Sequence, residues 1–145
     1  MRKTAITSSM IAVAALLAAS AAQASGTEPG PYPKAQMAIG VYQGEKACKT
    51  AAYDKAIDAL NQINAELATI KQAGTPRGID LRFEQYMVYF DLADTAKSKH
   101  CWDEAESLYR AVLAQYANMA YQHPQDRAQS SLDDLQKARA KAGGK

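Results

Sequence analysis

A short pattern that occurs twice in this chain constrains its fold more than any other feature. The segment Tyr53–Ala56 (YDKA) corresponds to Trp102–Ala105 (WDEA), 49 residues later. Downstream of each copy, Leu60 aligns with Tyr109 at the next apolar position. A proline then follows the alanine of each copy after 19 or 20 residues. Internal similarity of this kind predicts one supersecondary unit that the chain uses twice.

The spacing of apolar residues indicates that this unit is helical. Between residues 53 and 72, apolar side chains recur every three or four positions, which is typical of one buried helix face. No segment alternates with a period of two for long enough to form a strand. After a Gly/Pro-rich break at residues 74–78, Asp80 is expected to cap the next helix. Pro124 fits the first turn of a last helix.

We therefore expect a single all-α domain over residues 34–145. It contains one helical hairpin at residues 34–73, a second at residues 79–121, and a last helix at residues 124–142. An ordinary four- or five-helix bundle is the alternative, because small and aromatic residues also alternate in simple core packing.

The two hairpins resemble the tetratricopeptide repeat. In the second hairpin, Tyr89 and Ala93 match the large and small positions of the repeat's first helix, and Ala105 and Tyr109 match those of its second helix. The first hairpin matches less well, with Gly40 at a position where a large residue is expected. The period is 49 residues rather than the family's 34, and the proline that normally ends each repeat is absent. The resemblance implies two divergent, elongated repeats, and the last helix would cap their stack.

The N-terminal segment has the character of a secretory signal peptide. Arg2 and Lys3 precede the uncharged, Ala- and Leu-rich segment 10–22, and Ala22-Gln23-Ala24 is a small-x-small cleavage pattern. We expect residues 1–24 to be removed and residues 25–33 (SGTEPGPYP) to form a flexible Pro/Gly leader. The expected location is the periplasm, with full secretion as the alternative. No stable membrane span is expected in the processed chain.

The charge balance argues against nucleic acid as the partner. The whole chain has 17 Lys and Arg residues against 15 Asp and Glu residues. Loss of Arg2 and Lys3 with the signal peptide leaves 15 of each. Nucleic acids and anionic membranes are bound by a surplus of positive charge, which the processed chain lacks. Another envelope or secreted protein is therefore the expected partner.

Cys48 and Cys101 are the only two cysteines of the chain. An even number of cysteines in an exported protein favours a disulfide, and the hairpin arrangement brings the two positions to the same side of the stack. A pair of buried free thiols is the alternative. A redox-active pair is disfavoured because the chain has no C-x-x-C spacing.

The sequence predicts neither an enzyme nor a cofactor site. The segment His100–Glu104 (HCWDE) offers nitrogen, sulfur and oxygen ligands, but adjacent residues rarely converge on one metal ion. The chain lacks the zinc, EF-hand and haem-attachment spacings and the nucleophile-elbow pattern. We therefore expect His100 to be a solvated residue at a helix end.

The expected function is that of an exported, non-catalytic interaction module, an adaptor or accessory subunit that binds a peptide or helix of its partner. A helical binder of a small molecule or metal is the alternative. The repeat resemblance implies that first helices carry the binding face. The residues that it would present are Met87, Phe90, Asp94, Lys97 and Ser98 in the second hairpin, and Val41, Glu45 and Lys49 in the first. Phe90 and Met87 could equally belong to the core.

Overall fold

The computed structural model of the protein describes residues 28–72, 74–120 and 122–143. These residues form five helices and no strand, which confirms the all-α prediction. The predicted signal peptide at residues 1–24 and the first part of the leader lie outside the described residues. The helices are α2 (Pro31–Gly44), α3 (Ala51–Thr69), α4 (Pro76–Ser98), α5 (Trp102–Tyr116) and α6 (Gln122–Gly143).

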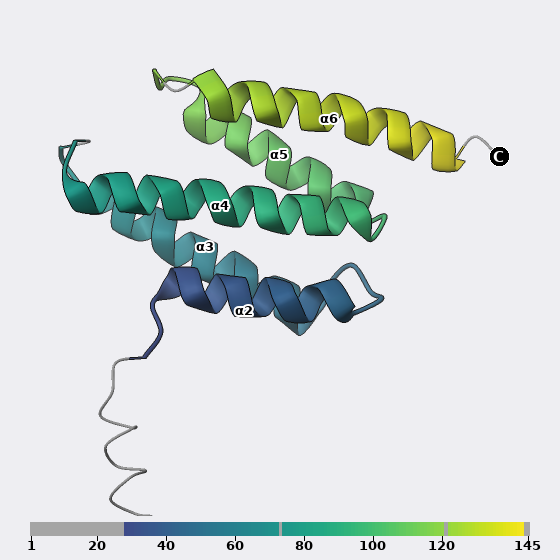
Figure 1. Ribbon diagram of the computed structural model, residues 1–145, viewed down its shortest axis with the longest axis horizontal. Coiled ribbons are helices and arrows are strands. Elements are labelled where there is room, and N and C mark those ends of the chain that lie inside the picture. Colours follow the sequence, from purple (N-terminus) through teal and green to yellow (C-terminus); the bar gives the residue numbers. More distant parts are fainter. Residues whose placement is uncertain (1–27, 73, 121, 144–145) are drawn as a thin grey trace, which may run out of the picture.

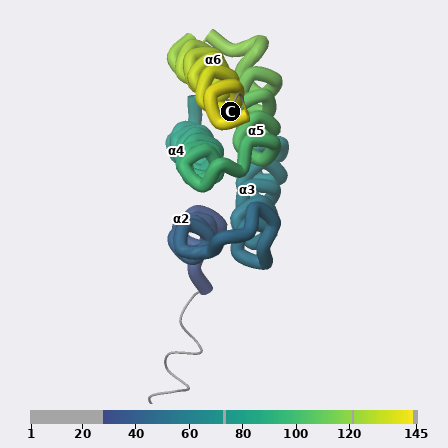
Figure 2. Tube along the Cα trace, turned by 90° about the vertical axis from the view of Figure 1, so that its right-hand side faces the viewer, coloured from purple at the N-terminus to yellow at the C-terminus, as the bar shows by residue number. Residues whose placement is uncertain are grey.

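The helices form two layers (Figures 1 and 2). Helices α2, α4 and α6 lie side by side in the first layer, and α3 and α5 cross behind them in the second layer. Chain neighbours pack together: α2 packs on α3, α4 on α5, and α6 on α5, and the hairpins meet where α4 contacts α2 and α3. The α2–α3 hairpin therefore forms one end of the stack, and α6 forms the other (Figure 1). This arrangement contains the two predicted hairpins and the separate last helix, and its five helices are also compatible with the bundle description.

Two helix starts differ from the sequence prediction. Thr75, not Asp80, caps α4: its hydroxyl accepts a hydrogen bond from the backbone N–H of Gly78 at 3.2 Å. The predicted leader also ends earlier than expected, because α2 begins at Pro31. Proline is favoured in the first helical turn, where its missing N–H has no intrahelical acceptor and its ring holds φ near the helical value. At Pro31 and at Pro76, residues of a Pro/Gly-rich run form the first turn of a helix, where the sequence predicts a loop.

Helix α2 ends at Gly44, since Glu45 is extended with ψ 149°. Cys48 therefore lies in the connecting loop and not in the first helix. Thr50 then caps α3 by accepting a hydrogen bond from the N–H of Tyr53 at 3.2 Å. This places the first copy of the repeated pattern at the start of α3, just as the second copy starts α5.

The turn between α4 and α5 is only three residues long and ends α4 with a Schellman motif. His100 has a positive φ of 62°, the N–H of His100 bonds to the carbonyl of Lys97, and the N–H of Cys101 bonds to the carbonyl of Ala96 at 2.8 Å. These two bonds satisfy carbonyls that would otherwise lack a partner at the helix end. The motif turns the chain sharply, so α5 packs back against α4.

The core runs the length of the stack and contains a polar network at the place where the hairpins meet. Gln85 of α4 is 1% exposed, and its amide donates to the side-chain oxygen of Asn64 in α3 at 2.6 Å. The hydroxyl of Tyr116 in α5 donates to the Gln85 amide oxygen at 3.0 Å. Because a buried amide is costly unless it is hydrogen-bonded, this network favours one register of α3, α4 and α5 over shifted ones.

Candidate functional site

The structure distributes the predicted binding residues over different surroundings. Phe90 is 1% exposed and lies in the core, where its ring centroid is 4.8 Å from that of Tyr86 and 6.2 Å from that of Tyr109. Met87 is half-buried. Phe90 thus matches the second of the two sequence interpretations, the core residue, and it offers no surface to a partner. The Phe90 ring packs between Tyr109 of α5 and the guanidinium of Arg127 from α6, whose carbon lies 4.0 Å from the ring centroid.

A groove on the first layer contains three of the predicted residues. One hollow of about 510 Å³ lies between α2 and α4, and a second of about 460 Å³ lies between α4, α6 and the start of α5. Asp94 and Ser98 line both hollows, and Lys97 lines the second. We call this surface the α4 groove. Its lining residues are Gln36, Ile39, Gly40, Gln43, Asp91, Asp94, Thr95, Lys97, Ser98, His100, Trp102 and Ala138.

Polar side chains line the part of the α4 groove between α2 and α4, and Trp102 and Ala138 add apolar surface at the end next to α6. Asp91 and Asp94 lie one turn apart on α4, and the amides of Gln36 and Gln43 line the α2 side. Burial and, next, the negative charge of Asp94 raise the pKa of Asp91. The groove therefore offers carboxylate and amide groups, which suit a polar or positively charged segment.

Asp94 is held in place from two other helices. The Tyr109 hydroxyl of α5 donates a hydrogen bond to one oxygen of Asp94, and the Arg127 guanidinium of α6 donates to the other at 3.1 Å. Arg127 also donates to the Tyr86 hydroxyl at 2.8 Å, and its guanidinium carbon lies 4.0 Å from the centroid of the Phe90 ring. Burial and the bond to Asp94 raise the pKa of Tyr109 far above its usual value, so it remains a donor.

Sequence reasoning did not find Arg127. It is 33 residues from Asp94 in the chain, and only the packing of α6 over α4 brings the two side chains together. No local spacing signal could have indicated this contact.

The other predicted residues line a different surface at the free end of the first hairpin. A hollow of about 520 Å³ lies along α2 and α3 on the side away from α4, and Val41 and Glu45 are among its lining residues. Met37 and Val41 are 59% and 60% exposed there. We call this surface the end face. Its lining residues are Lys34, Met37, Ala38, Val41, Glu45, Ala51, Ala52, Lys55, Asp58, Ala59 and Gln62. Lys49 is exposed in the loop and lines neither surface.

A further apolar hollow of about 400 Å³ lies where α4 begins and α5 ends. Ile79 and Phe83, which are 55% and 59% exposed, line it together with Met119 and Pro124. Neither residue belongs to the binding set predicted from the sequence. Phe83 lies against the end of α5 and the start of α6, whose residues Tyr116, Met119 and Pro124 line the same hollow.

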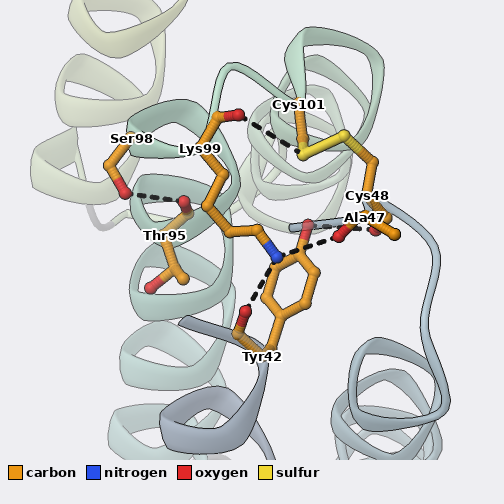
Figure 3. The surroundings of a disulfide bond; sticks show 7 residues. All are labelled: Tyr42, Ala47, Cys48, Thr95, Ser98, Lys99 and Cys101. Carbon is orange, nitrogen blue, oxygen red and sulfur yellow. Dashed lines mark hydrogen bonds between the residues drawn. A yellow bond between two sulfur atoms is a disulfide. The ribbon is translucent and has the colours of Figure 1, made fainter. Parts of the chain in front are cut away.

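The predicted disulfide is present and links the loop of the first hairpin to the start of α5. The Cα atoms of Cys48 and Cys101 are 5.4 Å apart. Beside it, Lys99 donates hydrogen bonds to the carbonyls of Tyr42 at 2.7 Å and Ala47 at 2.9 Å (Figure 3). Its ammonium nitrogen lies 3.4 Å from the centroid of the Tyr42 ring. Burial lowers the pKa of Lys99 and raises that of Tyr42 to about 12. A disulfide and the hydrogen bonds and cation–π contact of Lys99 thus join the hairpins.

The region of His100 shows packing rather than convergent ligands. The His100 ring stacks on Trp102 with their centroids 4.9 Å apart. Within the described residues, the one group of three potential metal ligands consists of Cys48, Cys101 and Glu104. Both sulfur atoms of that group are bonded to each other, so neither is a thiolate.

The sequence matches no known family model, and neither the curated proteins nor the solved structures contain a match. Among the helices of residues 28–72, 74–120 and 122–143, none has the length and apolar character that crossing a membrane requires. The geometry of this chain is therefore the basis on which a function is inferred.

Proposed function

We propose that this protein is an exported, non-catalytic interaction module of the periplasm, built on tetratricopeptide-like hairpins, and that its α4 groove binds a peptide or helix of another envelope or secreted protein. The observation that supports this most directly is the α4 groove itself. Its two hollows share Asp94 and Ser98, so they form one surface that runs across all three helices of the first layer.

The groove suits a ligand with positive or amide side chains. Asp91 and Asp94 supply carboxylates at its centre, and Gln36 and Gln43 supply amides along its edge. Arg127 and Tyr109 hold Asp94 in one position, so a ligand meets an ordered carboxylate rather than a mobile one. An ordered acceptor costs less conformational entropy on binding.

Gly40 provides a test that does not disturb the core. It is exposed, lines the groove, and has no atom within 4 Å of the place where a Cβ would lie. Gly40→Arg therefore places a long cation in the groove without a steric clash. Gly40→Ala is the matched control, because it leaves the groove open and favours the helix by about 1 kcal/mol.

The experiment is affinity purification of the tagged protein from the envelope fraction after mild cross-linking, with wild type and both Gly40 variants. We expect one partner near a one-to-one ratio with wild type and Gly40→Ala, and at least about a tenfold loss with Gly40→Arg. Ser98→Arg, on the α4 side of the groove, should have the same effect. Equal recovery with all four proteins would show that a partner binds elsewhere, and recovery of no partner would contradict the proposal.

A further inference from the structure

The end face is an apolar surface that the fold leaves uncovered. Along the stack, the α4–α5 hairpin covers one side of the α2–α3 hairpin, but no described element covers the other side (Figure 1). Met37 and Val41 project from α2 there, and small alanines of α2 and α3 form the floor between them. In stacked helical hairpins, a terminal surface requires either a polar exterior or a neighbour that covers it. The end face has an apolar centre, which favours a neighbour.

The charges around this centre are arranged symmetrically. Lys34 near the start of α2 and Glu45 directly after its end line the hollow, with Met37 and Val41 between them. On α3, Lys55 and Asp58 line the same hollow. In each pair a cation and an anion lie at similar distances on either side of a midpoint, near residue 39 in α2 and near residues 56–57 in α3. The two midpoints are almost equally distant from the loop that joins the helices, so they lie side by side.

We propose that the end face binds the end face of a second copy of this chain, giving a two-fold symmetric dimer. A two-fold axis through both midpoints, running from the first layer to the second, places α2 antiparallel to its copy and α3 antiparallel to its copy. Lys34 then faces Glu45 of the other copy, and Lys55 faces Asp58 of the other copy. Met37 of each copy meets Val41 of the other around the axis. Such a self-complementary surface is the requirement for an isologous dimer.

The dimer has a consequence for the first layer. Because the axis runs from one layer to the other, each α2 lies next to the α2 of the other copy, and six first-layer helices form one continuous sheet of helices. Both α4 grooves then open on the same side of the dimer. Dimer formation does not depend on the proposed function of that groove, since the two surfaces have no lining residue in common, even on the helix α2 that both include.

Analytical ultracentrifugation of the purified protein over a range of concentrations tests the dimer. Wild type should sediment as a dimer that dissociates on dilution. Met37→Glu should weaken dimerisation by at least about tenfold, because it buries a charge at the axis. Phe83→Glu is the matched control: Phe83 is as exposed as Met37, at 59%, but lies on α4 away from the end face. It should leave the dimer intact.

Charge exchange tests the orientation. Lys34→Glu alone and Glu45→Lys alone each bring like charges together twice in the dimer, so each should weaken it. An equimolar mixture of the two variants should restore the dimer as a heterodimer, in which both facing pairs are again opposite in charge. A wild-type protein that stays monomeric at the highest attainable concentration overturns the proposal. A dimer that Phe83→Glu disrupts and Met37→Glu does not, or a mixture that stays as weak as the single variants, overturns it equally.

Discussion

The two ends of the helix stack differ in how far their apolar side chains are covered. At one end, α6 buries Ala128, Leu132 and Leu135 against the hairpins, and the described surface of α6 has no large exposed apolar side chain. At the other end, α2 buries Ala35, Ala38, Ile39 and Tyr42 but exposes Met37 and Val41.

This difference shows what a capping helix contributes. Helix α6 carries a narrow apolar stripe and is otherwise polar, so it can be the last element of the stack. Helix α2 carries apolar residues on two sides, so it resembles an internal element whose neighbour is missing. We infer that the apolar surface at the α6 end is fully covered in the monomer, and that the apolar surface at the α2 end is covered when two copies associate.

Removal of the disulfide should have the largest effect and should fall mainly on the α2–α3 end. The bridge joins residues 53 positions apart, and closing a loop of this size stabilises a fold by about 4 kcal/mol in the chain-entropy model. The Cys48→Ala/Cys101→Ala double variant should lose about 2–5 kcal/mol in urea unfolding. Hydrogen exchange should rise more in α2 and α3 than in α6. Unchanged stability, or a rise spread evenly over all five helices, would contradict this.

The next largest effect should come from truncating the apolar stripe at the capped end. Leu135 is 1% exposed, so Leu135→Ala leaves a cavity and should cost about 2–5 kcal/mol. At the other end, Met37 is 59% exposed, and Met37→Ala should change the stability of the dilute, monomeric protein by less than about 0.5 kcal/mol. Thermal unfolding of Leu135→Ala and Met37→Ala, each compared with wild type, measures the two losses of stability. Equal losses would show that the two ends are not different in the monomer.

The cations at the two junctions should have intermediate and similar effects. Arg127 joins α6 to α4 through Asp94 and Tyr86, and Lys99 joins α4 to the end of α2. Arg127→Met and Lys99→Met each keep an unbranched apolar side chain but lose the charged hydrogen bonds, so each should cost about 1–2 kcal/mol. Because the sites are on opposite sides of α4, the double variant should be additive within about 0.5 kcal/mol. Urea unfolding of wild type, the two single variants and the double variant measures this. A loss of stability in the double variant that differs from the sum of the single losses by more than about 0.5 kcal/mol would show that the two junctions are coupled.

The smallest effect should be a pH dependence at Asp91, between α2 and α4. Its raised pKa means that ionisation is harder in the folded protein than in the unfolded chain, where the pKa is about 3.9. Asp91 therefore favours the folded state most at low pH, and this contribution is lost as pH rises through the raised pKa. Asp91→Asn should gain stability relative to wild type as the pH rises above about 4, by less than about 0.5 kcal/mol. If the difference in unfolding free energy between wild type and Asp91→Asn does not change with pH, the pKa of Asp91 is not raised in the folded protein.

Particular residues show how far local sequence patterns reach. The repeated pattern at Tyr53 and Trp102 correctly indicated the starts of two equivalent helices, because the spacing of apolar residues along a helix is a local property. The starts at Thr75 and Pro31 were misplaced, since a Pro/Gly-rich run looks the same whether it ends a loop or begins a helix. The disulfide was predicted correctly because only one pairing of two cysteines exists.

The candidate site was less accessible to sequence reasoning than the helices. Phe90 and Asp94 are one turn apart on α4, yet Phe90 is buried under Arg127 while Asp94 is half-exposed in the α4 groove. Met37 lies on a face of α2 that no described element covers, and it is 59% exposed there. A helical pattern shows which residues share a face, but not which neighbouring helix covers that face.

The amino-acid sequence by itself therefore determined the all-α class and the two hairpins, and favoured the pairing of Cys48 with Cys101, because each depends on spacing along the chain or on composition. Only the tertiary structure decided which apolar residues are covered, which carboxylate Arg127 holds, and that the free end of α2 and α3 is apolar at its centre and charged at its rim. These properties depend on contacts between helices distant in the chain, and burial is set by the packed neighbour rather than by the residue alone.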